Sequence, residues 1–283
     1  MSNKYRLTSN AFEREKEEDK IEPSRLLFLS MEGSDTEKEY IDGLNKYKNE
    51  LNLNSTISIE PLFRRKKDGS TAPKLVIELL EEYLTLRKEG IDVQIKQLLN
   101  NDYSSEIITN YINNPSLLSP ATIKEIDFKL EKIGYDLQYK KYLENIKKDG
   151  DLFGIVIDKD SWDNIEEIID YCKEKGYYVF ISNPCFELWL LFHWIDISTL
   201  PNDKQNLIAL NPKKSNKHTY VSYYLSDIAH HGKTRISFKT KYLNKLDIAI
   251  QNANKFETDL TKLPSKMGTN WPSLINLLKE NLK

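Results

Sequence analysis

Two aspartates at the end of a short apolar run are the residues whose type and spacing most clearly indicate chemistry. Residues 152–157 are rich in β-branched and aromatic side chains, which is typical of a strand buried on both faces of a parallel sheet. Because side chains alternate along an extended chain, Asp158 and Asp160 project to the same side, roughly 7 Å apart. Carboxylates so placed suit a divalent cation. The spacing also fits a solvated turn whose aspartate caps a helix starting near Asn164.

A third acid, Glu32, follows another expected strand, residues 26–29. Gly33 comes directly after it and allows a sharp turn into the amphipathic helix that follows. In open α/β sheets, ligands bind outside the carboxyl ends of the strands. Glu32 is therefore expected at the same edge of the sheet as Asp158.

A strongly apolar helix is expected over residues 185–194, and it carries one carboxylate, Glu187, in its first turn. Burying a lone carboxylate is unfavourable unless it is paired or bound to a cation, so Glu187 is a candidate ligand or general base. Stabilisation by the positive end of the helix dipole is the alternative. Asn183, just before this helix, is expected near the acids, whereas His193 at the far end is expected to be a packed or capping residue.

A run of four positive charges follows the expected strand of residues 56–62. A charge run is often only a solvated face, but this one should lie beside the acidic edge, where a phosphate backbone would also approach. Two lysines nearer the C-terminus are further basic candidates. The candidate nucleic-acid-binding residues are Arg64, Arg65, Lys66, Lys67, Lys239 and Lys241.

Composition limits the class of protein. The 283 residues suffice for one large or two modest domains. Two cysteines are too few for a zinc site or a disulfide framework, which indicates a reducing compartment. The N-terminal residues are polar and no apolar run reaches the length of a membrane span, so we expect a cytoplasmic protein without membrane contact. The net charge of -2 gives no global attraction for nucleic acid, so such contacts must come from local patches.

The order of the expected elements predicts an α/β fold. Residues 1–24 are charged and are expected to form a loosely held arm. Residues 25–199 alternate strands and helices, which favours a parallel sheet with helices on both faces. Residues 91–149 show only helical patterns and are interpreted as an insertion between two strands. Residues 200–283 are expected to begin with a polar connection and to be mainly helical.

Three acids that converge at one edge of such a sheet would form an oxygen-rich cation site. That ligand set suits Mg²⁺ or Mn²⁺ rather than zinc. The chemistry of such sites is phosphoryl transfer or hydrolysis, in which the cation stabilises charge on the phosphate and a nearby carboxylate moves protons.

Several segments resemble the RloB-like family. Residues 31–40, MEGSDTEKEY, are similar to its E-G-x-T-E-x-x-Y signature, with one extra residue before the Thr-Glu pair. Residues 157–160, IDKD, resemble its D-x-D motif, and residues 181–194, ISNPCFELWLLFHW, closely match its S-N-P-C-F-E-L-W-L-L-L-H-F block. The tail, at residues 249–253 and 271–274, is also similar to the end of the family.

The resemblance implies a Toprim-like fold, in which a glutamate after the first strand and a D-x-D motif after the third hold Mg²⁺. Glu32 matches the general acid/base glutamate of that pattern, and Asp158 and Asp160 match the metal ligands. Glu37 takes the place of the glutamate in the Thr-Glu pair of the signature, shifted by the extra residue.

RloB-like proteins are associated with restriction-modification and abortive-infection loci, often beside an ATPase of the ABC or OLD type. The resemblance therefore implies an antiviral endonuclease that is the toxic effector of a phage-defence system, with such an ATPase as its partner. A near-neutral chain fits a structured RNA, with tRNA a candidate, better than duplex DNA. Two alternatives stay open: a non-catalytic Toprim-fold subunit that regulates the ATPase, and a nucleotidyl-transferring or primase-like enzyme. The oligomeric state is also open, and a homo-oligomer is compatible with the sequence.

Overall fold

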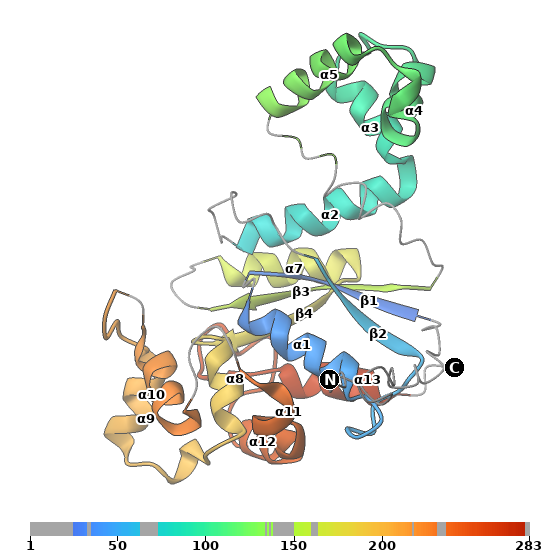
Figure 1. Cartoon of the computed structure of the whole chain (residues 1–283). Helices are drawn as coiled ribbons and strands as arrows, with labels where there is room; N and C mark the ends of the chain where they lie inside the picture. Colours follow the sequence, from blue (N-terminus) through green and yellow to red (C-terminus); the bar gives the residue numbers. More distant parts are fainter. Residues whose placement is uncertain are drawn as a thin grey trace, which may run out of the picture.

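The computed structural model describes residues 25–32, 35–62, 73–133, 135, 137, 150–159, 164–216, 218–230 and 236–280. A five-stranded sheet lies at the centre of these residues, with helices on both of its faces (Figure 1). The expected α/β architecture is confirmed. None of the helices in the described part of the chain is both long enough and apolar enough to cross a membrane.

The elements follow one another in an α/β order that is extended by helices at the C-terminal end. The strands are β1 (Arg25–Met31), β2 (Ile57–Leu62), β3 (Leu152–Asp158), β4 (Tyr178–Asn183) and β5 (Gly268–Thr269). The helices up to β4 are α1 (Thr36–Lys46), α2 (Pro73–Glu89), α3 (Ile91–Leu98), α4 (Ser105–Asn113), α5 (Pro120–Lys132) and α7 (Ile165–Lys175). The later helices are α8 (Phe186–Phe192), α9 (Asn202–Leu210), α10 (Tyr220–Ala229), α11 (Phe238–Lys241), α12 (Leu246–Ala253) and α13 (Trp271–Lys279). Short 3-10 turns are η2 (Pro115–Leu117), η3 (Ile197–Thr199) and η4 (Leu243–Lys245).

The strand order is β2-β1-β3-β4-β5. Strands β1 to β4 are parallel, and β5 is antiparallel to β4. The chain leaves β1 toward β2 on one side and leaves β3 toward β4 on the other, so the winding reverses between β1 and β3. In sheets of this kind, that reversal opens a crevice at the carboxyl ends of the strands.

Two hydrophobic clusters cover the two faces of the sheet, because side chains alternate along the strands. Leu27 and Leu29 of β1 belong to the cluster formed with α1, α8, α10, α12 and α13. Phe28 belongs to the opposite cluster, formed with α2, α7 and the helices that follow α2. The first cluster includes residues from both sides of position 200, so the C-terminal helices share a core with the sheet.

The residues predicted to form a helical insertion contain three described helices after α2. Helices α3, α4 and α5 form a group beyond α2, away from the sheet (Figure 1). Ser104 and Ser119 cap α4 and α5 by accepting hydrogen bonds from Ile107 N and Thr122 N. Residues 134, 136 and 138–149 of the expected insertion lie outside the described residues.

The expected polar connection after residue 200 is wrong, because α9 and α10 occupy most of it. Helix α9 has little amphipathic pattern, and α10 is rich in tyrosine and β-branched residues, which prefer extended structure to helix. Tertiary packing overrides that preference: Val221, Leu225 and Ala229 of α10 are buried at roughly helical spacing. Asn211 and His230 end the two helices in the left-handed conformation without glycine.

The amino end of the sheet is held by a buried ion pair. Asp151, just before β3, accepts hydrogen bonds from Leu26 N at 2.9 Å and from Arg87 of α2 at 2.8 Å. The Arg87 guanidinium also lies over the rings of Phe28, Tyr83 and Phe153, at 5.4, 5.6 and 5.4 Å from their centroids. This contact joins β1, α2 and β3 at the edge opposite the acids.

Tyr40 of α1 is the centre of the core that joins the C-terminal helices to the sheet. Its ring makes edge-on contacts with the aromatic residues Phe186, Trp189, His193, Phe238, Tyr242 and Trp271. His193 Nδ1 lies 3.0 Å from the Trp189 carbonyl oxygen, which can only accept, so Nδ1 carries the proton. Nε2 is therefore the acceptor, and the Tyr40 hydroxyl donates to it at 3.1 Å.

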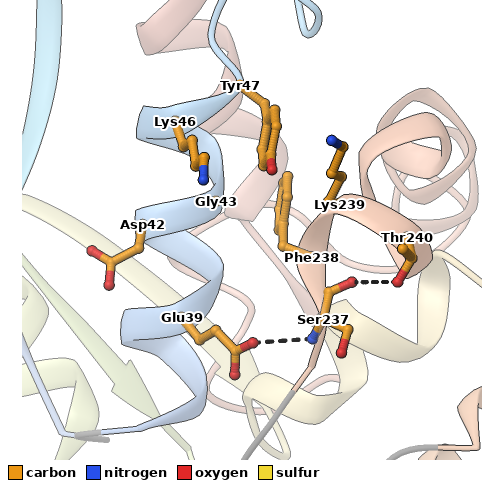
Figure 2. A pocket seen from close by; sticks show the side chains of 9 residues that line it. All are labelled: Glu39, Asp42, Gly43, Lys46, Tyr47, Ser237, Phe238, Lys239 and Thr240. Atoms are coloured by element: carbon orange, nitrogen blue, oxygen red, sulfur yellow. Dashed lines mark hydrogen bonds between the residues drawn. The ribbon is translucent and has the colours of Figure 1, made fainter. Parts of the chain in front are cut away.

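Gly43, one turn beyond Tyr40, lets α11 approach α1. A Cβ at this position would lie 2.2 Å from the ring of Phe238. Glu39 fastens the same approach, since its carboxylate accepts hydrogen bonds from Ile236 N at 2.9 Å and Ser237 N at 3.0 Å (Figure 2 shows the second). The close packing of Phe238 thus requires a residue without a side chain on α1.

Replacing Gly43 with alanine should destabilise the protein by about 1–2 kcal/mol, although alanine is the better helix former by about 1 kcal/mol. The added methyl group overpacks against Phe238. Chemical denaturation of wild type, Gly43→Ala, Phe238→Ala and the double variant checks this as a double-mutant cycle. In the Phe238→Ala background the Gly43→Ala change should be neutral or stabilising; a stabilising effect in the wild type would contradict the prediction.

Protonation of His193 should make the protein less stable in mild acid. Burial, with a smaller contribution from the charge of Lys245, lowers the pKa of His193 from 6.5 to about 3. The unfolded chain therefore takes up a proton at a pH where the folded protein does not, and stability is lost as the pH falls below the unfolded value. The expected loss from this group is about 1.4 kcal/mol between about pH 7.5 and 5.5.

Urea denaturation at several pH values in this window measures the effect. His193→Gln keeps a donor and an acceptor but cannot be protonated, so its free energy of unfolding should fall less steeply with decreasing pH than that of the wild type. His230→Gln, which removes an exposed imidazole, is the matched control. Equal slopes for the wild type and His193→Gln would contradict the prediction.

Candidate functional site

The structure brings Glu32 and Asp158 together at the carboxyl ends of β1 and β3. The parallel pairing of the two strands continues one step past β1, where Glu32 N donates to Val156 O at 3.3 Å. The Glu32 side chain then turns toward β3, and its Oε2 accepts a hydrogen bond from Asp158 N at 3.4 Å. Two of the three predicted acids are thus neighbours, although 126 positions separate them in the sequence. They lie at the point where the winding of the sheet reverses.

Strand β4 borders Asp158 on its other side. Asp158 pairs with Ser182 in the register of the sheet, and Lys159 N donates to Ser182 O at 2.9 Å. The next residue, Asn183, donates from its side-chain amide to Leu263 O at 2.7 Å. Asn183 therefore lies at the acidic edge as expected, and the bond shown by the structure joins it to the C-terminal segment.

That C-terminal segment closes the β4 edge with hydrogen bonds that the sequence did not reveal. The Asn270 side chain accepts from Ile181 N at 2.7 Å and donates to Val179 O at 2.8 Å, so it replaces a backbone neighbour of β4. The hydroxyl groups of Ser182 and Thr269 lie 3.0 Å apart. β4 is thus paired along both sides, which fixes the strand beside Asp158.

Asp160 and Gly33 lie outside the described residues, so the structure leaves the third predicted ligand and the turn after Glu32 as predictions. Within the described ranges, no group of three or more histidine, cysteine, aspartate or glutamate side chains could hold a metal ion. Glu187 therefore does not complete such a group with Glu32 and Asp158. It is half-buried in the first turn of α8, which begins at the same sheet edge as the end of β4.

The donor chemistry of the acidic edge fits a hard divalent cation. Glu32 and Asp158 offer carboxylate oxygens from adjacent strands, and these are the donors that Mg²⁺ and Mn²⁺ prefer. Asp160, two residues after Asp158, is the expected third donor.

Two of the predicted supporting residues, His193 and Glu37, lie on helices that the structure describes. His193 is buried at the C-terminal end of α8, which agrees with the packed or capping role expected for it. Its hydrogen bond with Tyr40 joins the helix that follows Glu32 to the helix that follows Asn183. Glu37 lies in the first turn of α1. The sequence predicted an apolar helix at residues 185–194 but not its contacts with Tyr40, because the residues in contact are distant in the chain.

The structure treats the predicted basic residues differently: some lie outside the described residues, one caps a helix, and one is exposed to solvent. Arg64, Arg65, Lys66 and Lys67 lie outside the described residues. Lys241 donates to Ala229 O and His230 O, both at 2.7 Å, and so caps the C-terminal end of α10. Lys239 is exposed beside a pocket of about 360 Å³ between α1 and α11. Figure 2 shows Lys46 and Lys239 on either side of the stacked rings of Tyr47 and Phe238, whose centroids lie 6.1 Å apart.

Comparison with known proteins identifies the family. No curated protein and no solved structure matches the chain. The family model for the RloB-like protein matches residues 27–278, which include all the segments that carry the resemblance. The chain therefore belongs to the RloB-like protein family.

Proposed function

We propose that this protein is a metal-dependent endonuclease that hydrolyses phosphodiester bonds. The observation that carries the proposal is the contact between the Glu32 carboxylate and the backbone of Asp158 at the reversal point of the sheet. Carboxylates from adjacent strands at such a crevice suit a cation that binds a phosphate. Family membership agrees with a Toprim-like site but does not by itself define the reaction.

Glu32, Asp158 and Asp160 are the residues that would hold Mg²⁺ or Mn²⁺. When bound, the cation supplies stabilisation of the negative charge on the scissile phosphate and lowers the pKa of a bound water. Glu32 is the proposed general acid/base, because its carboxylate is positioned by the Asp158 amide and can transfer a proton at its oxygen atoms. Glu187, at the start of α8, is a second candidate for proton transfer at the same edge.

The biological setting is the second part of the proposal. Members of the RloB-like family are associated with abortive-infection and restriction loci. We therefore propose that this protein is a toxic effector of phage defence that acts in the cytoplasm with an ABC- or OLD-type ATPase. RNA, with tRNA a candidate, is the favoured substrate. The alternative, a non-catalytic subunit that regulates the ATPase, makes the opposite prediction for the acidic residues.

Purified protein should cleave total RNA in the presence of Mg²⁺ or Mn²⁺ and should lose this activity in chelator. Glu32→Gln should reduce the cleavage rate about 10²- to 10⁴-fold, the range for loss of a general acid/base, and Asp158→Ala should abolish cleavage. Gel analysis of total RNA and of plasmid DNA measures both rates. Asp170→Ala, which removes an exposed carboxylate on α7, is the control that should cleave at the wild-type rate.

Cleavage by Asp158→Ala at the wild-type rate would reject the proposed site. The partner ATPase should be included in a second set of reactions, because an effector can be latent without it. Full phage protection in cells by a Glu32→Ala, Asp158→Ala double variant would support the regulatory alternative instead.

A further inference from the structure

Positive charge is concentrated in one segment, although the whole chain carries a net charge of -2. Between positions 204 and 245, the sequence contains nine lysine and arginine residues but only one acidic residue, Asp227. Such an excess on a near-neutral chain is the kind of local patch that attracts a polyanion. The basic residues are Lys204, Lys213, Lys214, Lys217, Lys233, Arg235, Lys239, Lys241 and Lys245. Lys217, Lys233 and Arg235 lie outside the described residues, so no contact is assigned to them.

A tight hairpin holds two of these lysines at the start of α10. Lys213 and Thr219 form an antiparallel bridge, and the backbone N–H groups of Lys214 and Ser215 donate to His218 O at 2.8 and 3.1 Å. Both lysine side chains are exposed. The Lys214 ammonium lies 5.2 Å from the centre of the Tyr220 ring. The hairpin thus places positive charge next to an aromatic surface.

Three tyrosines follow the hairpin within the first turns of α10: Tyr220 is buried, Tyr224 is partly buried, and Tyr223 is exposed. Tyr220 and Tyr224, one turn apart, are stacked, with ring centroids 5.9 Å apart and planes at 28°. Tyr223 is 56% exposed, and among the described residues its ring and hydroxyl make no aromatic contact and no hydrogen bond. Tyr223 lies one turn beyond Tyr220, the ring that Lys214 contacts. Single-stranded nucleic acid is bound by this combination of groups: bases stack on an exposed ring, and phosphates contact ammonium groups.

The surface lies near the acidic edge of the sheet. Helix α8 begins where β4 ends, beside Asp158, and α10 packs against α8 in the same hydrophobic cluster. Figure 1 shows α9 and α10 beside α8 on the left of the molecule, the side at which β3 and β4 end. A nucleic-acid strand bound on α10 can therefore extend toward Glu32 and Asp158.

We propose that Lys213, Lys214 and Tyr223, supported by the Tyr220–Tyr224 pair, form a binding surface for single-stranded nucleic acid. A duplex is disfavoured because its bases are already stacked and cannot cover the exposed ring. Asp227, exposed one turn after Tyr223, would repel phosphates and so marks the end of the surface. The delivery of the strand to the acids depends on the proposed nuclease function, but the binding itself does not.

Fluorescence anisotropy with the full chain in chelator tests the binding without cleavage. The probes are fluorescein-labelled 12-nucleotide strands of RNA and of DNA, and the corresponding duplexes. Tyr223→Ala should weaken binding to single strands about tenfold, and Tyr223→Phe should restore it. Lys213→Ala with Lys214→Ala should weaken binding and reduce the slope of log affinity against log salt by about 1.4, the value for two lost phosphate contacts.

Matched changes on α5 control for general effects of charge and exposed aromatic area. Lys124→Ala with Lys132→Ala removes two exposed lysines, and Phe128→Ala removes a ring that is 66% exposed. These variants should keep wild-type affinity. An abasic strand should bind the wild type about as weakly as the normal strand binds Tyr223→Ala.

Three results would overturn the proposal: no binding of single strands by the wild type, equal weakening by the α5 variants, or displacement of the strand by a polyglutamate peptide at equal charge concentration. The last would indicate an acidic protein partner. Preference for RNA over DNA would identify the strand that the surface selects. Binding in chelator that persists when no cleavage is found with Mg²⁺, either with or without the partner ATPase, would reject the nuclease function but keep the binding surface.

Discussion

The parallel pairing of β1 with β3 is the constraint on which the rest of the structure depends. These strands lie side by side although α1, β2, α2 and the helical insertion come between them in the sequence. At the amino end, Asp151 fixes the pairing through Leu26 and Arg87; at the carboxyl end, Glu32 continues it through Val156 and Asp158. A slip in register would separate the Glu32 carboxylate from Asp158 and would turn the alternating faces of β1 away from their two cores. The acidic edge therefore has a defined geometry only because the whole strand pair has one.

The C-terminal helices are part of the same construction. Tyr40 connects the helix after Glu32 to α8, α11 and α13 through edge-on ring contacts and its hydrogen bond to His193. Asn270 and Thr269 then pair with β4 from the other direction. Because α1 and β4 both lead to the acidic edge, packing in this aromatic core determines where the acids can lie. The family segments around Tyr40 and His193 thus have a structural reason to occur together.

The sequence predicted the sheet well and the C-terminal half less well, for physical reasons. Strands such as residues 152–157 are continuous apolar runs, which are a strong local signal. Helix α7 is followed by Gly176 in the left-handed conformation, which is a local signal for the end of a helix. The neighbourhood of Glu32 and Asp158 also followed from the rule for carboxyl ends of parallel strands. Helix α10 and strand β5 could not be read in this way. The first is stabilised by burial against α8, and the second is two residues long and needs Gly268, where a Cβ would lie 1.9 Å from Glu257 O.

The basic residues show why a charge seen in sequence does not define a contact. Lys241 belongs to the basic segment, yet its ammonium binds two carbonyl oxygens at the end of α10, and Lys245 lies over the Trp194 ring at 3.1 Å. Lys213 and Lys214 carry the same charge but project from a hairpin whose backbone bonds do not involve their side chains. The fold thus assigns some lysines to its own helix ends and rings and leaves others toward solvent beside aromatic side chains. An overall charge near zero is compatible with nucleic-acid binding when the charges are divided between surfaces in this way.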